Sequence, residues 1–461
     1  MIRIHIRAIA AVAAAGAVLA TAPFVSSAQV TPAVVNLVGG NGDDGARPLS
    51  LAEAVELAQR NLPAAIQARN QERSAAAAVR AAKGSLIPTL SIGATTGYSA
   101  GTTINNFDGS LTRIGGNPYS YGNSLSMSLQ LFDGGSRFSE IKRNGFVAEA
   151  ANVAVLTSRF DAALQAKQQF YAALAARESE GAARAQLEQA DQQLKASIAR
   201  LNAGVITKSD SLRSVIQVGN AQLAVLTAQN DLRVANAALT RITGATSLVT
   251  ANPTDTSYVA MPQITEAELL RTIPDAPAIQ LSEANLSIAR AAKRTQRAAY
   301  LPTVSATFGY NLSANSRQLT SGSLVLPFQS NPSRQSVNFS MSYPIFNGFA
   351  REQNAVNADI AVNNAEANLR DARLTASANL STQLRSLNNA NARIQVQLQS
   401  IAAADEDLRV MQQRYALGAS TLLDLLTSQT QLNQARQALI QARFDARVAK
   451  AQLESLLGRE L

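Results

Sequence analysis

The chain has 461 residues and a formal net charge of +9, and it contains no cysteine and a single histidine, His5. This composition excludes disulfides and thiol nucleophiles, and without residue 5 it leaves no imidazole for general-base catalysis or zinc binding. No Gly-x-x-x-x-Gly-Lys-Ser/Thr loop for binding phosphate is present. We therefore expect a protein that is not an enzyme and that needs no cofactor or metal.

Residues 1–28 have the pattern of a secretory signal peptide. Arg3 and Arg7 make a basic start, an apolar run covers 8–20, and small residues at 26–28 suit a cleavage site. A membrane anchor is the alternative, but the run is shorter than the ~20 residues that a bilayer requires. Export would bring the scattered positive charges next to solvent, anionic lipid or acidic partners rather than nucleic acid.

The rest of the chain contains the same pattern twice. Its motifs recur 214 positions apart, as in Pro63 and Pro277 (277 − 63). This repetition predicts a flexible N-terminal segment, a first repeat, a linker rich in Thr, Pro and Asn, and a second repeat, at 29–48, 49–244, 245–264 and 265–461. The Gly- and Asp-rich residues 39–45 are interpreted as part of the flexible segment rather than as a calcium site.

Four stretches alternate apolar and polar residues with a period of two, which predicts β-strands with one apolar and one polar face. They lie at about 89–99, 124–132, 303–313 and 336–346. A soluble sheet packed on a core would show the same pattern. Each stretch, however, has the ~9–11 residues that cross a bilayer when tilted, and its polar positions are Ser, Thr, Gly and Asn, which suit a water-filled lumen. Between paired strands, 100–123 and 314–334 are expected to be surface loops.

Four strands are too few to close a barrel in a membrane, because such barrels begin at eight strands. An open sheet edge in lipid would leave backbone groups unsatisfied, at several kcal/mol each. If these strands span a membrane, several chains must therefore share one barrel. The number of chains is left open by this reasoning.

A long helical hairpin follows each pair of strands, at about 136–243 and 350–457. The first helix, over 136–202, would be ~100 Å long at 1.5 Å per residue. Large apolar residues and alanines recur every seven positions, as at Leu380 and Leu387, which predicts left-handed coiled coils. The narrow apolar stripe suits a wall one helix thick. A plain coiled-coil stalk is the alternative, but it would give no reason for the strands.

The end of each hairpin repeats one motif, Arg-x-x-x-Gly-x5-Asp, at 200–210 and 414–424. The glycine fits a helix C-terminus, where a positive φ is needed. A threonine three residues before the aspartate has the spacing of a capping box for the next helix, with Asp in the position usual for Glu. The residues are Arg200, Gly204, Thr207 and Asp210 in the first tip and Arg414, Gly418, Thr421 and Asp424 in the second.

Together with the repeat, these turns and the strand boundaries resemble the TolC family of outer-membrane efflux channels. The strands begin at Ile-Pro-Thr-Leu-Ser and Leu-Pro-Thr-Val-Ser and end at Phe-Asp-Gly-Gly and Phe-Asn-Gly-Phe, and the resemblance covers nearly all of the chain after the signal peptide. It implies an α+β fold, mostly α: a homotrimer whose long helices form a periplasmic α-barrel and whose four strands per chain share one transmembrane β-barrel of twelve strands. Such a channel conducts drugs or secreted proteins, as in type I secretion, from an inner-membrane transporter and a periplasmic adaptor (membrane fusion) protein to the exterior.

The resemblance also implies roles for residues of the two tips. Asp424 matches a ring aspartate at the narrowest point of the tunnel, and Asp210 and Tyr415 match a latch that holds the tip shut. Arg200, Gly204, Arg414 and Gly418 belong to the turns that dock the adaptor. Ser420 and Thr427 depart from the family pattern, which has a latch arginine and a second ring aspartate at these positions. Three symmetry-related carboxylates in a constriction would favour cations and raise one another's pKa. Asp424 is thus expected to be a gate, a helix cap, or both.

Other classes of envelope protein remain as alternatives. A periplasmic adaptor also has a long helical hairpin, but it would carry one hairpin with compact β domains rather than two full repeats. A structural coiled-coil protein or adhesin would not need the strands, and an enzyme lacks its usual catalytic residues. The sequence names neither the transported substrate nor the pump.

Overall fold

A computed structural model of the protein describes residues 45–98, 102–107, 110–115, 119–252, 266–318, 325–330 and 333–461. The chain separates into two units, Met1–Gly40 and Asn41–Leu461. The first unit, with the expected signal peptide, lies outside the described residues, as does 39–44 of the glycine-rich segment. The fold below is that of the second unit.

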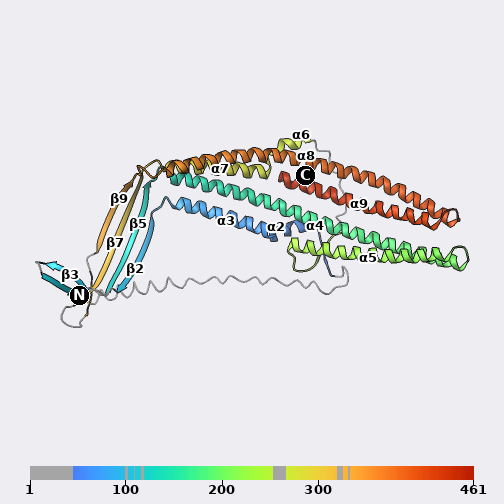
Figure 1. The fold of residues 1–461 in the computed structure, drawn as a ribbon, viewed down its shortest axis with the longest axis horizontal. Coiled ribbons are helices and arrows are strands. Elements are labelled where there is room, and N and C mark those ends of the chain that lie inside the picture. Colours follow the sequence, from blue (N-terminus) through green and yellow to red (C-terminus); the bar gives the residue numbers. More distant parts are fainter. Residues whose placement is uncertain are drawn as a thin grey trace. The chain divides into compact units, whose positions relative to one another are not determined.

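Two helical hairpins dominate the fold (Figure 1). In the first, α4 covers Ser136–Asn202 and α5 covers Lys208–Thr243; in the second, α8 covers Ala350–Ala416 and α9 covers Leu422–Leu457. Both long helices have 67 residues and both return helices have 36. The helix bounds agree with those expected from the sequence, and 67 residues correspond to a length of ~100 Å.

Each hairpin is held together by the heptad positions that the sequence shows. Toward the tip, buried side chains of α8 and α9 form two apolar clusters: Ala390, Ile394, Leu439, Ala442 and Ala446, and nearer the tip Leu408, Leu422, Leu425 and Leu432. Toward the other tip, the buried cluster between α4 and α5 is made of smaller residues, Ala190, Val218 and Ala221, and the hydroxyls of Ser197 and Ser214 lie 2.9 Å apart in that interface. Alanine and serine at these positions let the paired helices approach closely.

Shorter elements pack against the half of the long helices that is nearer the large sheet (Figure 1). They are α2 (Leu51–Asn61), α3 (Pro63–Gly84), α6 (Glu266–Thr272), the 3-10 helix η2 (Ile273–Asp275) and α7 (Pro277–Ala298). Helix α3 packs on α4, and α7 packs on both α4 and α8. In the part of the chain that is described, no helix is both long and apolar enough to cross a membrane.

A small parallel pair, β1 (Arg47–Leu49) with β6 (Val249–Ala251), joins the start of the first repeat to the segment between the repeats. Arg47 and Pro48 were expected to be flexible and are instead part of β1. The reason is burial at the end of the pair, since Leu49 and Val249 lie in one apolar cluster with Phe170 of α4. The pairing also places an ordered strand inside the expected linker 245–264.

The large sheet is antiparallel and consists of β2 (Thr89–Tyr98), β5 (Tyr119–Phe132), β7 (Thr303–Gln318), β8 (Val325–Ser330) and β9 (Arg334–Ser342). Its order is β2-β5-β7, and both β8 and β9 pair with β7, one beyond the other. The sheet therefore has four strand positions. The two halves of the repeat meet at the β5–β7 pair, in its middle.

Three details of the strands differ from expectation. The last strand ends at Ser342 rather than near 346, because Pro344 has no N–H to donate to a ladder. A separate hairpin, β3 (Thr102–Phe107) with β4 (Ser110–Gly115), lies in the segment expected to be a loop, as does the start of β5. Strand β8 lies in the other expected loop. Glycine and asparagine in these segments indicated turns, but Thr, Ile, Leu and Phe between them are good strand formers.

Candidate functional site

The two tips of the hairpins have the same backbone geometry. Gly204 and Gly418 have φ values of 71° and 73°, which glycine adopts without a steric penalty. The N–H of Val205 donates to the carbonyl of Arg200 at 2.9 Å, and the N–H of Ala419 donates to that of Arg414 at 2.8 Å. These are Schellman turns, which satisfy the last carbonyls of α4 and α8. The way in which each long helix ends therefore explains why the glycine recurs four residues after the arginine in both tips.

The two aspartates begin the return helices. Oδ2 of Asp424 accepts from the N–H and the hydroxyl of Thr421 at 2.9 and 2.7 Å, and the N–H of Asp424 donates to that hydroxyl at 3.2 Å. Asp210 makes the same capping box with Thr207. The hydrogen bonds from the side chain and then the backbone of Thr421 lower the pKa of the Asp424 carboxyl. Within one chain this effect is opposite to the rise expected from a ring of carboxylates.

Tyr415 connects the two tips, but not through its hydroxyl. The guanidinium carbon of Arg200, at the end of α4, lies 4.7 Å from the centre of the Tyr415 ring at the end of α8. The Tyr415 hydroxyl is buried and has no hydrogen-bond partner among the described residues, and the same is true of the Ser420 hydroxyl. Within one chain the structure therefore brings Arg200 onto Tyr415 and does not bring Asp210 to it. No sequence pattern indicates this contact, because Arg200 and Tyr415 are far apart in the chain.

The remaining tip residues lie on the surface. The side chain of Arg414 is exposed. The hydroxyl of Thr427 donates to the carbonyl of Leu423 within its own helix, at 2.8 Å. Leu417 is 84% exposed, and other apolar side chains at this end are exposed as well: Val205, Leu212 and Leu423. The tips thus present an apolar surface that a single chain leaves uncovered.

The register of the large sheet divides its side chains into two faces. Residues directly opposite one another in adjacent strands point to the same face. One face carries the apolar rows Leu90–Met127–Phe308–Val337 and Ile92–Leu125–Tyr310. The other carries the polar rows Thr89–Ser128–Thr307–Asn338 and Ser91–Ser126–Gly309–Ser336. Apolar and polar positions therefore separate in these rows, as the alternation in the sequence predicted, although Gln335 lies opposite Tyr310 and Asn123 lies opposite Leu312 on the apolar side.

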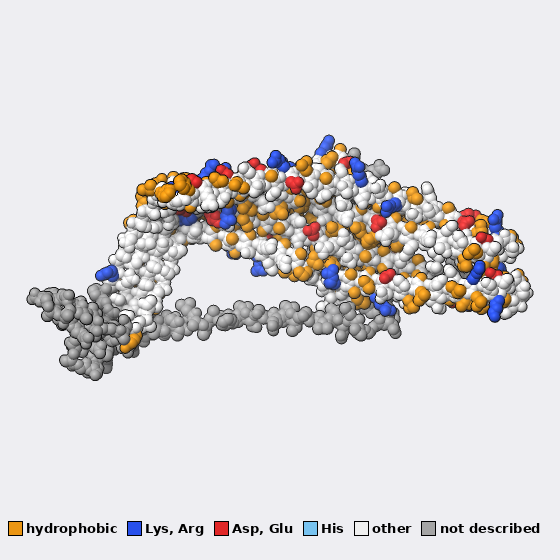
Figure 2. Space-filling model, viewed as in Figure 1, with side chains coloured by type: hydrophobic (Ala, Val, Ile, Leu, Met, Phe, Trp, Pro, Cys, Tyr) orange, Lys and Arg blue, Asp and Glu red, His pale blue; other side chains and the backbone are white. Residues whose placement is uncertain are grey.

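The polar face is linked by hydroxyl contacts across the strands. The hydroxyls of Ser91 and Ser126 lie 2.6 Å apart, and those of Ser305 and Ser340 lie 2.7 Å apart. In the view of Figure 2, the visible surface of the sheet is almost free of hydrophobic and charged side chains. A face of this kind is suited to water. The opposite face is exposed and apolar, with Phe339 at 73% exposure.

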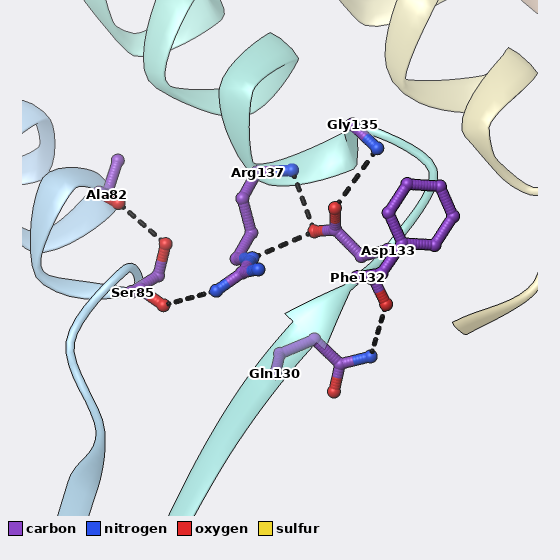
Figure 3. A network of polar contacts seen from close by, with 7 residues as sticks. All are labelled: Ala82, Ser85, Gln130, Phe132, Asp133, Gly135 and Arg137. Carbon is purple, nitrogen blue, oxygen red and sulfur yellow. Dashed lines mark hydrogen bonds and ion pairs between the residues drawn. The ribbon is translucent and has the colours of Figure 1, made fainter. Parts of the chain in front are cut away.

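The passage from strand to helix is fixed by Asp133 in the first repeat (Figure 3). Its carboxylate accepts from the N–H of Gly135 at 3.1 Å and from the N–H and Nε of Arg137 at 2.9 and 3.1 Å. Nη1 of Arg137 donates to the carbonyl of Ser85, before β2, at 3.1 Å. Asp133 therefore caps α4 and ties it to the neighbouring strand. The Asp-Gly-Gly-Ser-Arg stretch, with Asp and Arg four residues apart, is the sequence signal for this arrangement.

Residues 54–245 and 271–459 match the family described as outer membrane efflux protein. The chain belongs to this family. It is 26% identical to protein CyaE of Bordetella pertussis over 399 residues, which cover 84% of this chain and 80% of the relative. It is 25% identical to outer membrane protein TolC of Escherichia coli over 391 residues, which cover 82% and 76% of the two chains.

Solved structures agree on the fold. The outer membrane channel CmeC of Campylobacter jejuni matches with a TM-score of 0.73 at 16% identity, covering 88% of this chain and 85% of CmeC. The MtrE outer membrane channel of Neisseria gonorrhoeae, solved in its open state, matches with a TM-score of 0.71 at 18% identity, covering 89% of both chains.

The family assigns the function. The protein is an outer-membrane efflux or secretion channel with a long periplasmic part. Its family consists of channel proteins rather than enzymes, and these channels work with adaptor and pump partners. In the part of the chain that the structure describes, no group of three or more acidic, His or Cys side chains could hold a metal ion.

Proposed function

We propose that three copies of this chain close their sheets into one transmembrane barrel and their helices into one periplasmic tunnel. The observation that carries the proposal is the large sheet, which has an apolar face, a polar face and two outer strands, β2 and β9, that each pair on one side only. In lipid, those outer strands need partners. Three copies with four strand positions each give twelve strands, a number within the range of membrane barrels.

The mass of the assembly tests this proposal. Light scattering of the detergent-solubilised protein should give three chains per particle, and a gel of the unheated sample should show a band that heating converts to the monomer. A protein that is monomeric in mild detergent while still folded by circular dichroism would contradict the proposal. A proline at Phe339 in the outer strand β9 should reduce assembly, whereas the same change in the loop residue Asn347 should not.

In this assembly the two tips form the gate of the tunnel. Asp424, Asp210 and Tyr415 belong to this gate, and Asp424 lines its narrowest point. One fact supports a role beyond capping: the Asp424 side chain is exposed in the single chain. Three ionised carboxylates around a constriction would select for cations.

The closed state of this gate is held by Arg200 on Tyr415, in place of a hydrogen-bonded latch. The proposal takes its support from the stacking distance, from the unpartnered hydroxyl of Tyr415 and from serine at position 420. The stacking joins the last turn of α4 to the last turn of α8. It therefore opposes separation of the two hairpins within each chain.

The tips also dock the periplasmic adaptor, which links the channel to an inner-membrane transporter. Gly204 and Gly418 shape the turns, and a side chain on either would be strained by the positive φ, although no atom lies within 4 Å of the added carbon. The exposed apolar side chains beside them, such as Leu417, supply the contact area. Photo-crosslinking from position 417 in whole cells should capture the adaptor, and crosslinking from the exposed Leu374, in the middle of α8, serves as the control.

The division of the chain remains part of the proposal. Residues 1–28 are removed on export, 29–48 precede the first repeat at 49–244, and 245–264 connect it to the second repeat at 265–461. The mass of the protein purified from outer membranes tests the cleavage. An intact N-terminus on that protein would contradict it.

A further inference from the structure

The two junctions between the sheet and the long helices differ at one position of the repeat. The residue is Asp133 in the first junction and Asn347 in the second (347 − 133 = 214). The carbonyl of Asp133 accepts from the N–H of Ser136 at 3.2 Å, and the carbonyl of Asn347 accepts from the N–H of Ala350 at 3.4 Å. The two turns share this hydrogen bond, so they compare a carboxylate with an amide in one setting.

The carboxylate of the first junction has partners that the amide of the second lacks. Asp133 accepts from the Nε of Arg137 as well as from two backbone N–H groups (Figure 3). Arg351, the equivalent arginine, donates through Nη1 and Nη2 to the carbonyls of Pro344 and Ile345, at 2.9 and 3.1 Å. Its Nε is buried and has no hydrogen-bond partner among the described residues. Because a buried donor without an acceptor is costly, a carboxylate would suit the second junction better than an amide.

Asn347 is followed by glycine in an open turn. The hydrogen bond of the turn joins its first and last residues, which leaves the N–H of Gly348 outside it. A Cβ added to Gly348 would meet no atom within 4 Å, and residues 341–350 are exposed throughout. In the first junction a Cβ added to Gly134 would lie 2.6 Å from the carbonyl oxygen of Ala298. Water and hydroxide therefore reach the peptide group after Asn347 freely.

We propose that Asn347 is a site of spontaneous deamidation, and that the aspartate formed completes at the second junction the cap that Asp133 makes at the first. Glycine has no side chain to hinder attack by its nitrogen. The backbone nitrogen of Gly348 loses its proton to hydroxide and bonds to Cγ of Asn347, and the Cγ–Nδ2 bond breaks with release of ammonia. Water then adds across one of the two C–N bonds of the succinimide, which gives aspartate or isoaspartate. The net reaction converts an amide and water into a carboxylate and ammonium.

The aspartate product has two sources of stabilisation at this position. A negative charge before the first turn of α8 is favoured by the helix dipole. The carboxylate can also accept a charge-assisted hydrogen bond from the Nε of Arg351, four residues on, as Asp133 does from Arg137. Isoaspartate carries its carboxylate on a lengthened backbone and does not restore this geometry. Chains that have been folded for longer therefore contain more of the completed cap.

Helix α4 contains a matched control. Asn144 also precedes a glycine, Gly145, but both residues lie inside the helix. Nδ2 of Asn144 donates to the carbonyl of Glu140 at 3.0 Å, and backbone N–H groups inside a helix are engaged in its hydrogen-bond ladder. Reaction at Asn144 therefore requires the helix to open locally. A third Asn-Gly pair, at 41–42, lies outside the described residues.

Peptide mass spectrometry tests the site. Protein extracted from outer membranes is incubated folded at mildly alkaline and mildly acidic pH, and then digested at acidic pH. The Asn347 peptide should gain the mass of an amide-to-acid exchange, faster at alkaline pH, with both aspartate and isoaspartate present. The Asn144 peptide should react at least about tenfold more slowly, which corresponds to a helix-opening free energy of about 1.4 kcal/mol. In protein unfolded in guanidinium the two peptides should react at similar rates. Equal rates in the folded protein, or an Asn347 peptide that stays intact there, would overturn the proposed site.

Two variants test the completed cap. Asn347→Asp represents the product, and Asn347→Gln keeps an amide that does not form the five-membered ring. In thermal unfolding of the solubilised protein, Asn347→Asp should melt a few degrees above Asn347→Gln. The difference should shrink when both changes are made together with Arg351→Gln. Equal melting temperatures, or a difference that persists without the arginine, would overturn the pairing of the new carboxylate with Arg351.

Discussion

The contact between Arg200 and Tyr415 makes a sharp prediction about the closed state of the tunnel. Tyr415→Leu removes the ring, and Arg200→Gln removes the cation. At an exposed site such a cation–π contact contributes about 0.5–1 kcal/mol. In the proposed trimer it occurs three times, so either variant loses roughly 1.5–3 kcal/mol of closed-state stability. Since 1.4 kcal/mol corresponds to a factor of ten, the open fraction should rise roughly 10- to 140-fold.

Single-channel recording in planar bilayers measures this open fraction. Tyr415→Phe keeps the ring and removes only a buried hydroxyl that has no partner among the described residues, so it should stay as closed as the parent protein. Arg200→Lys should fall in between, because lysine keeps the charge but lacks the planar group that stacks. Arg414→Gln, the equivalent change in the other tip, is the matched control and should have no effect.

One result would refute the stacking argument. If Tyr415→Phe opens the channel as much as Tyr415→Leu, the hydroxyl carries the closing force, through a hydrogen bond to a neighbouring subunit. If neither variant changes the open fraction, the contact does not hold the gate at all.

Three further predictions follow from other contacts. Asp424→Asn should reduce cation selectivity, and Asp210→Asn should have a smaller effect; reversal potentials in a salt gradient measure both. The capping hydrogen bonds lower the pKa of Asp424. Cation selectivity and the stabilisation from this cap should therefore be complete above the ordinary carboxyl pKa and be lost only as pH falls through the lowered value. Lys167→Met removes the partner that lies 2.5 Å from the buried Glu454, which should destabilise the solubilised protein by roughly 3 kcal/mol. Lys450, 3.8 Å from Glu454, limits this loss of stability. Thermal unfolding measures the loss, and the double variant Lys167→Met, Glu454→Leu should recover most of the stability. Asp133→Ala should cost about 1–2 kcal/mol in the same assay through the lost cap of α4, and Asn347→Ala at the equivalent position should cost less, since Arg351 there binds backbone carbonyls.

Much of the fold was accessible from the sequence because the signals are local. The bounds of α4 and α8 follow from heptads and from the glycine turns, which act within a few residues. The two faces of the sheet follow from the alternation of apolar and polar residues along each strand. This alternation can be recognised without knowing any tertiary contact. The alternation at 124–132 therefore predicted the rows that contain Ser126 and Met127 correctly.

The features that sequence reasoning missed depend on pairs that are far apart. Strand β6 was read as linker because only its pairing with β1, about 200 residues away, makes it a strand. The same limit applies to the tips. The family pattern suggested Asp210 and Tyr415 as partners, but the position of Arg200 relative to Tyr415 depends on how two hairpins pack, which periodicity within either hairpin does not specify.

The stacking of Arg200 on Tyr415 explains how the tip could close with serine rather than arginine at position 420. In the family pattern an arginine at position 420 would bring a cation to the tip from the second repeat. Here the cation beside Tyr415 comes from the first repeat, at the end of α4. That cation sits in the last turn of its helix, where the helix dipole favours a positive charge, and its own backbone carbonyl already forms the Schellman turn. Arg200 can therefore both end its helix and stack on Tyr415, so the tip can be held shut without an arginine at 420. A Ser420→Arg variant would place a second cation near the same ring, and it should alter closure only where Arg200 has been removed.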